Sequence, residues 1–278
     1  MKNVSKNWQE RIVPVMLITI TLLFISLFLV LPLVSVFVEA FRNGTALYFA
    51  SFKDDYVWSA IYLTIICALI AVPLNVVFGV VAAWCIAKFK FWGRNVLITL
   101  IDLPFAISPV IAGLVLVLAF GQRSALGSWL IDHGLTIIFA PPGIILATVF
   151  VTIPFVAREL IPLMEEQGTL EEEAAVALGA GGWSIFWRVT LPNIKWGLLY
   201  GVILCNARAM GEFGAASVVS GHITSTSTIP LYIETLYAGY DAVAAFSLAT
   251  ILACLALVTL VAKSIVEWKV KRERAREA

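Results

Sequence analysis

Two ionisable residues stand within one long apolar run of the sequence. Arg208 and Glu212 are four positions apart, so they share one face if the run is helical. An ionisable side chain inside a membrane-crossing helix is costly and by default indicates a function. Two interpretations are open. Arg208 lines the path of an anion while Glu212 holds it or takes part in a gate, or the two residues form an internal ion pair that only steadies the helix.

A proline break interrupts another apolar run, and the serine before it offers a hydroxyl group. Ser108 precedes Pro109, and Asp102 lies shortly before them. Interrupted helices recur at transport sites, so Ser108 and Pro109 are candidates for the same path, unless the kink only shapes packing. We expect Asp102 near the cytoplasmic interface. Arg158 and Glu159 are expected to pair with one another there.

The sequence offers no catalytic or metal-binding set. Its two histidines, His133 and His222, are far apart, and no GxxxxGK[ST] phosphate loop occurs. We therefore expect no enzyme activity, no metal and no cofactor on this chain, and any nucleotide that powers it must bind to another chain. The cysteines have no CxxC spacing and lie in apolar runs, where free cysteine packs as a small hydrophobe: Cys67, Cys85, Cys205 and Cys254.

The segments that carry these residues are too apolar for a soluble domain. Of the 278 residues, 61% are hydrophobic and 13% are charged, against about 25% charged in soluble domains. A bilayer-crossing helix needs about 20 apolar residues. We therefore predict an all-α polytopic membrane protein with six spans: 12–38, 58–87, 96–120, 143–164, 194–216 and 244–267. The first run is too long for the apolar part of a signal peptide, about 7–15 residues, and is expected to stay as an anchored helix.

Lysine and arginine predict the orientation, because they are enriched in cytoplasmic loops. They gather in the N-terminal segment, in the loop after the second span, between the fourth and fifth spans and in the C-terminal tail. The opposite side has only Arg42, Lys53 and Arg123. Both termini are therefore expected in the cytoplasm, and the loop 217–243, which has no Lys or Arg, outside. The basic tail is either a topology signal or a lipid-binding patch.

An acidic segment interrupts the apolar sequence on the predicted cytoplasmic side. Its five acids are Glu165, Glu166, Glu171, Glu172 and Glu173. Thr169 is predicted to cap a short helix, with Glu172 closing a capping box, and acids in the first turn suit the helix dipole. We expect these acids to cap and orient the helix rather than to form a site.

Small and aromatic residues follow the acids. Ala174, Ala175 and Gly179 fall on adjacent stripes of the short helix and permit another backbone to come close. Gly179 and the glycines after it are predicted to end the helix, and Trp183 and Trp187 add large apolar groups outside the spans. Such a surface favours docking in a groove of another protein, unless the loop packs on its own helices.

The spacing of this segment resembles a known motif. Glu173-Ala174-Ala175, three residues, Gly179, nine residues, Val189, one residue and Leu191-Pro192 is similar to the EAA loop of type-1 permease subunits of binding-protein-dependent ABC importers, in which Ile stands in place of Val189. The resemblance implies that residues of about 168–192 form coupling helices seated in a groove of an ATPase subunit. Trp183 and Trp187 are then expected as anchors, and Leu191-Pro192 as the stop that passes movement to the fifth span.

The resemblance extends over most of the chain. It implies a type-1 transmembrane domain at 58–267, preceded by an added N-terminal helix within 1–57 and followed by a basic tail at 268–278. The stretches 102–121 and 207–221 resemble sulfate, thiosulfate and molybdate permeases, most closely the CysW-type subunit of sulfate/thiosulfate importers. No residue separates sulfate from molybdate or tungstate.

The partners implied by the resemblance are several. They are two CysA-type ATPase subunits that bind ATP and Mg²⁺, a homologous second permease of the CysT/CysU type, and a periplasmic protein that delivers sulfate or thiosulfate. The chain would lie in the bacterial inner membrane, in contact with lipid and not with nucleic acid.

Two further expectations concern the fifth span and the loop that follows it. Gly197 and Gly201 form a GxxxG pair that permits close packing, so the fifth span is expected to face a partner subunit. Pro230 is predicted to begin a short amphipathic helix that meets a binding protein or forms a lid. The rival classes are an ion-driven transporter, which would favour inverted repeats, and a membrane enzyme, which would need a convergent catalytic set.

Overall fold

The computed structural model describes the backbone of residues 2–221 and 226–277 and the side chains of 13–221, 226–269 and 272. All regular structure in this part of the chain is helical. The elements in chain order are α1 (Lys2–Ile25), η1 (Ser26–Val30), α2 (Leu31–Ala40), α3 (Thr45–Ala50), η2 (Ser51–Lys53), α4 (Asp55–Lys88), α5 (Arg94–Ala106), α6 (Pro109–Phe120), α7 (Ala125–Asp132), α8 (Pro141–Gln167), α9 (Leu170–Ala177), α10 (Gly182–Ile185), η3 (Phe186–Thr190), α11 (Leu191–Met210), α12 (Gly214–Ser220), α13 (Ile229–Ala238) and α14 (Ala242–Glu277).

Four described helices are long and apolar enough to cross a membrane. They are Val13–Ala40, which joins the end of α1 to α2, together with α4, α8 and the stretch Ala242–Lys269 of α14. These agree with the predicted spans 12–38, 58–87, 143–164 and 244–267 to within a few residues. The all-α prediction is confirmed.

The other two predicted spans are broken. Helices α5 and α6 meet at an angle of 109°, and the helix Gly182–Met210 meets α12 at 48°. The first break falls where Ile107 and Ser108 take extended backbone angles before Pro109, since proline disfavours a helical residue before it. The proline break predicted within 96–120 is therefore present, and the helix predicted at 194–216 bends near Gly211 and Phe213.

The core lies where α4, α8 and α11 pack together. Gly79 of α4 allows a close approach to α8, because a Cβ there would lie only 2.7 Å from the Cβ of Val156. Asn75 is fully buried between the three helices, and its Nδ2 donates to Oγ1 of Thr152 at 2.6 Å and to the carbonyl of Val149 at 3.2 Å. Such polar bonds join helices where water is scarce.

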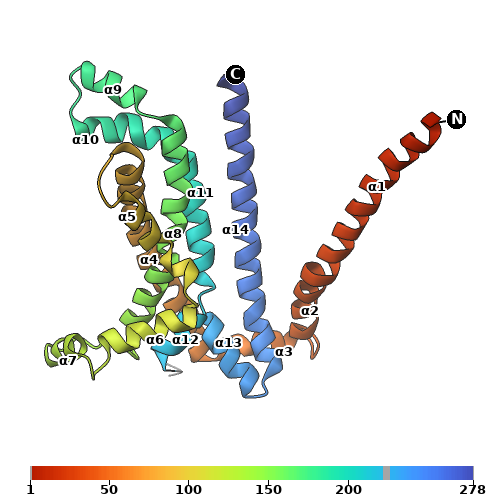
Figure 1. Cartoon of the computed structure of the whole chain (residues 1–278). Helices are drawn as coiled ribbons and strands as arrows, with labels where there is room; N and C mark the ends of the chain where they lie inside the picture. Colours follow the sequence, from red (N-terminus) through yellow and green to blue (C-terminus); the bar gives the residue numbers. More distant parts are fainter. Residues whose placement is uncertain (1, 222–225, 278) are drawn as a thin grey trace.

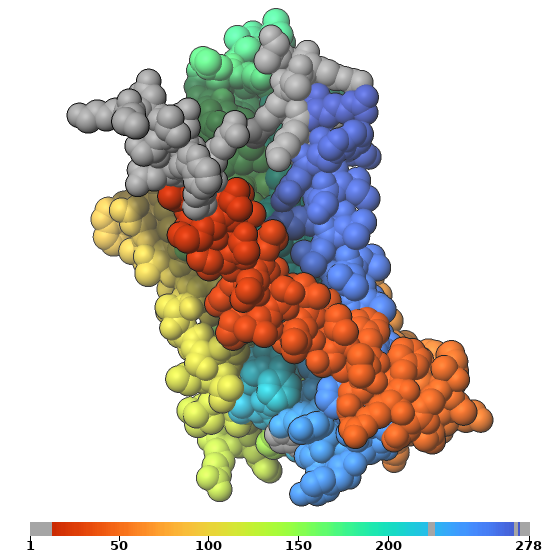
Figure 2. Space-filling view, turned by 90° about the vertical axis from the view of Figure 1, so that its right-hand side faces the viewer, coloured from red at the N-terminus to blue at the C-terminus, as the bar shows by residue number. Residues whose placement is uncertain are grey.

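The N-terminal helix stands away from this core. None of the most apolar window of Val13–Ala40 is buried, and its contact with the rest of the chain is made by α2 against α14. Figure 1 shows α1 leaning away from α14, and Figure 2 shows its described part crossing one face of the molecule in front of the other helices. The helix therefore leaves a long apolar surface without intrachain cover.

Candidate functional site

The acidic lobe, defined as residues 165–193, projects from one end of the molecule. Figure 1 shows α9 and α10 at this end, toward which the start of α1 and the end of α14 also point. No residue of α9 is buried. Leu170, Leu178 and Trp183 have exposed fractions of 80%, 90% and 75%. The lobe thus presents apolar side chains that the described chain leaves uncovered.

The end of α9 is a Schellman motif. The N–H of Ala180 donates to the carbonyl of Ala175 at 3.0 Å, and the N–H of Gly179 donates to that of Val176 at 2.9 Å. Gly179 has a φ of +85°, a conformation that glycine adopts without strain. A Cβ at Gly179 would meet no described atom within 4 Å. The turn therefore requires Gly179 for its backbone, while the space beside it is open to a partner.

The start of α9 differs from the predicted capping box. Thr169 makes no side-chain cap bond to the backbone; its hydroxyl donates instead to Oε1 of Glu173 at 2.6 Å. The Glu172 carboxylate bonds away from α9, to Lys88 and Thr190. The capping-box prediction is wrong because Glu172 finds a nearly buried ammonium group, and a charged partner makes a stronger hydrogen bond than a backbone N–H.

Several of the acids hold the lobe to the membrane helices. Glu165 pairs with Arg94 at the start of α5, Glu171 accepts from Asn193 at the start of α11, and Glu172 pairs with Lys88 at 2.7 Å. These contacts are structural. The expectation that the acids form no site of their own stays a prediction. They orient the lobe through its neighbours rather than through the helix end.

The Leu191-Pro192 pair does not stop the helix. The chain runs helically from Gly182 to Met210, with a π-helical turn at Phe186–Thr190 in which the N–H of Leu191 donates to the carbonyl of Phe186. Pro192 sits in the first turn of α11, as predicted, and the wider turn before it accommodates its missing N–H. The second half of the lobe is therefore continuous with α11.

The remaining residues of the motif lie on α9 and on the helical segment that leads into α11. Ala174 is exposed and Ala175 half-buried on α9, while Val189 and Leu191 are half-buried before and at the start of α11. Trp187 is 51% exposed and packs with Trp183 and Phe186, whose ring lies 5.7 Å from that of Trp84 on α4. The aromatic residues thus combine contact with their own chain and an exposed surface.

A second candidate site lies where the two broken helices meet. Arg208 Nη1 is 2.7 Å from Glu212 Oε2, and Glu212 Oε1 accepts from the N–H of Ala215 at 2.8 Å. The side chain of Glu212 is 2% exposed and that of Arg208 31%. The predicted pairing of these two residues is therefore present, and it caps the start of α12.

The breaks lie against one another. A Cβ at Gly214 would lie 2.9 Å from the Cβ of Pro109, and one at Gly113 would lie 2.7 Å from the carbonyl oxygen of Ala215. Ser108 is exposed at the start of α6. The structure thus brings Ser108 and Pro109, far away in sequence, to the same region as Arg208 and Glu212.

One expectation about charge is wrong, and the GxxxG pair does not face a partner, while the prediction that the fifth span as a whole faces a partner subunit stays a prediction. Arg158 pairs with Asp102 at 2.8 Å instead of Glu159, because adjacent residues on a helix point in different directions. Gly197 and Gly201 face α8 of the same chain, where a Cβ at Gly197 would overlap Leu163 and one at Gly201 would lie 3.3 Å from the Cα of Val156. The GxxxG pair therefore serves packing within the chain.

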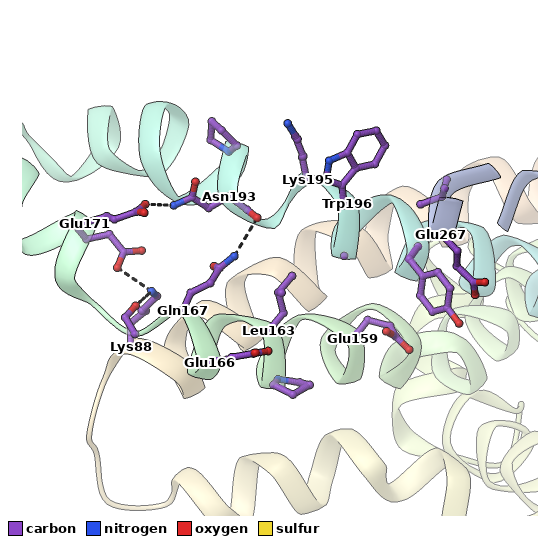
Figure 3. Close-up of a pocket in the computed structure, with 17 residues that line it drawn as sticks. Lys88, Glu159, Leu163, Glu166, Gln167, Glu171, Asn193, Lys195, Trp196 and Glu267 are labelled. Atoms are coloured by element: carbon purple, nitrogen blue, oxygen red, sulfur yellow. Dashed lines mark hydrogen bonds and ion pairs between the residues drawn. The ribbon is translucent and has the colours of Figure 1, made fainter. Parts of the chain in front are cut away.

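A cavity of about 920 Å³ lies beside the acidic lobe, between α8, α11 and α14 (Figure 3). Its charged lining is five carboxylates and two ammonium groups: Glu159, Glu166, Glu171, Glu172, Glu267, Lys88 and Lys195. A cavity with this excess of acids repels a dianion. Sequence reasoning missed this cavity because its lining residues come from helices separated by long stretches of chain.

No metal site is found among the described residues, in which no three His, Cys, Asp or Glu side chains converge. His133 stacks on Trp129, and its Nδ1 lies 2.7 Å from the carbonyl oxygen of Trp129. His222 lies outside the described residues.

Comparison with known proteins gives consistent results. Residues 75–274 match the family model described as "Binding-protein-dependent transport system inner membrane component". The sulfate transport system permease protein CysW of Synechocystis sp. is 52% identical over 261 residues, covering 94% of this chain and 95% of that protein. The sulfate transport system permease protein CysT of Escherichia coli (strain K12) is 35% identical over 241 residues, covering 86% and 87%.

The fold also occurs among solved structures. A chain of a bacterial alginate ABC transporter, crystallised in complex with a periplasmic protein carrying an alginate pentasaccharide, superposes with a TM-score of 0.78. The match covers 97% of this chain and 98% of that one at 18% sequence identity. The likeness at this identity concerns the fold.

Proposed function

The chain belongs to the family of binding-protein-dependent transport system inner membrane components, and from this premise we propose that it is the permease subunit of an ATP-driven importer of sulfate or thiosulfate. It is a transport component of the membrane and not an enzyme. The observation that carries the proposal is the acidic lobe. Its Glu173-Ala174-Ala175 triplet lies on α9, a helix with no buried residue, at one end of the membrane helices.

In this proposal α9 docks in a groove of an ATPase subunit. Gly179 ends the helix with open space around it, and Trp183 and Leu178 expose apolar surface beside it. ATP and Mg²⁺ bind to the ATPase chains. Their closure moves the lobe, and the helix continuous with it, α11, carries the movement into the membrane. The end that carries the lobe and the outermost helical residues of the chain is then cytoplasmic.

The anion path is proposed at the meeting of the two breaks. Helix α6 begins at Pro109, so its first N–H groups point toward the break and favour negative charge. Arg208 is partly exposed there, while Glu212 fixes its guanidinium. Ser108 adds an exposed hydroxyl. A tetrahedral dianion suits an arginine, a hydroxyl and a helix start, whereas the acidic cavity beside the lobe does not.

A second, homologous permease chain is proposed to cover the N-terminal helix. The most apolar window of Val13–Ala40 has no buried residue, and its hollowed face includes the small polar residues Thr19, Ser26 and Ser35, which permit another helix to come close. The relatives include permeases of two types, CysW and CysT, which supports a pair of distinct chains. A periplasmic binding protein would dock at the opposite end, near α7 and α13.

The test is uptake by the assembled transporter in proteoliposomes. The permease, its proposed partners and ATP are expected to give radiolabelled sulfate uptake that unlabelled thiosulfate competes. Competition by molybdate or tungstate without competition by thiosulfate would move the assignment to those oxyanions. ATP-independent uptake driven by an ion gradient would favour a secondary transporter instead.

Docking is tested separately by co-purification with the ATPase. Glu173→Lys and Gly179→Leu are expected to abolish it, while Glu166→Lys, an exposed charge change in the same lobe, serves as the matched control. Retention of the ATPase by both lobe variants would contradict the docking of α9.

A further inference from the structure

Lys88, the last residue of α4, is buried beneath the acidic lobe. Its side chain is only 7% exposed, although it lies at the end of a membrane helix where a lysine would be expected to reach water. In the sequence, Lys88 is only one of the positive charges that predict the orientation of the chain in the membrane. Its burial shows that it has a specific set of partners.

The two partners of Lys88, Glu172 and Gly168, both belong to the lobe. Nζ of Lys88 lies 2.7 Å from Glu172 Oε2 in the first turn of α9, and it donates to the carbonyl of Gly168. The other oxygen of Glu172 accepts from the hydroxyl of Thr190 at 3.0 Å. Figure 3 shows Lys88 below the lobe, with a dashed line from its ammonium group to a carboxylate of the lobe.

Gly168 is the joint between α8 and α9. It has a φ of +67°, and a Cβ there would meet no described atom within 4 Å. Lys88 therefore binds the joint itself, through its carbonyl, and the helix beyond the joint, through Glu172. Without these bonds, α9 could turn about Gly168 without moving α4.

A second contact fixes the α4–α5 turn to the same lobe. Arg94 pairs with Glu165 near the end of α8, and its Nε donates to the carbonyl of Ile86 in the last turn of α4 at 2.9 Å. The end of α4, the turn and the base of the lobe are thus joined by two cations. Helix α4 in turn packs along α8 and α11 through Gly79 and Asn75.

We infer that Lys88 is a positioning residue that transmits the movement of α9 directly to α4. The lobe then moves the membrane helices by two routes, one through the continuous helix into α11 and one through the Glu172–Lys88 pair into α4. This inference rests on the proposed transport function. Loss of the second route leaves ATP hydrolysis running while the membrane helices follow it incompletely.

The experiment measures anion taken up per ATP hydrolysed in the purified, reconstituted transporter. Lys88→Met keeps most of the length of the side chain and removes its charge. It is expected to leave ATPase association in place and to lower the uptake-to-hydrolysis ratio about tenfold, on the order of the 5–150-fold by which allosteric coupling typically changes a binding affinity. Lys90→Met, an exposed lysine two residues on, is the matched control and is expected to keep the wild-type ratio.

Two further variants keep the test decisive. Glu172→Gln preserves the shape of the partner and is expected to lower the ratio as Lys88→Met does; it decides the question if Lys88→Met does not assemble. The exchange Lys88→Glu with Glu172→Lys is expected to recover part of the ratio.

An unchanged ratio, with uptake and hydrolysis falling in parallel, overturns the inference and leaves Lys88 a purely structural residue. Failure of the proposed function looks different, because the wild-type assembly would then show no ATP-dependent uptake at all.

Discussion

The Arg208–Glu212 pair allows the two interpretations of the sequence to be separated by substitution. The carboxylate is almost fully buried, and the guanidinium is about one-third exposed. Arg208→Met leaves Glu212 as a buried charge without its partner, which typically costs 3–5 kcal/mol; we expect about 3 kcal/mol because solvent reaches the site. Glu212→Gln keeps an acceptor for the Ala215 N–H and leaves a partly hydrated arginine, at a cost of about 1 kcal/mol.

The double variant completes the cycle. Arg208→Met with Glu212→Gln removes both charges, so its stability should be close to that of Glu212→Gln alone, giving a coupling energy of about 3 kcal/mol. Thermal unfolding of the purified transporter in detergent measures the relative stabilities of the three variants. Equal destabilisation by the two single variants would refute the burial argument.

Transport gives the second half of the test. If Arg208 contacts the anion, the double variant recovers stability but not uptake, which should stay at least about tenfold low, as expected for the loss of one charge-assisted contact of 1.5–3 kcal/mol. If uptake recovers together with stability, Arg208 only steadies the helix and the proposed path is wrong.

The remaining predictions concern packing, docking and pH. Gly79→Ala should destabilise the protein by about 1–3 kcal/mol, seen as earlier thermal unfolding, because its Cβ would overlap α8. Gly179→Ala should cost about 1 kcal/mol from strain at positive φ, measured in the same way. Trp183→Ala should leave the unfolding temperature unchanged but weaken ATPase binding in a pull-down assay. Burial, with the hydrogen bond to Asp54, raises the pKa of Tyr232, so stability should fall as the pH rises above about 10, and Tyr232→Phe should abolish that fall in alkaline unfolding curves.

Apolar length and motif spacing predicted much of the architecture. Composition alone predicted the membrane spans of α4, α8 and α14, because crossing a bilayer demands about 20 consecutive apolar residues. The end of α9 at Gly179 was equally predictable, because a Schellman turn requires positive φ there. These are local properties, set by residues within one or two turns of one another.

The partners of the charged groups were not predictable in this way. Glu172 was expected to cap its own helix, yet it pairs with Lys88. Arg158 was expected to pair with its neighbour, yet it reaches Asp102 on another helix. Each side chain had an acceptable local partner, and only the packing of distant helices offered a better one.

The sequence by itself therefore determined that the chain crosses a membrane, where it crosses, and that an EAA-spaced lobe interrupts the spans. Only the tertiary structure decided that the breaks at Pro109 and Gly214 meet, that the GxxxG face packs on α8, and that a buried lysine joins the lobe to α4. The reason is physical. Hydrophobic pattern and turn geometry act over a few residues, whereas burial makes a charge depend on whichever helix is packed beside it.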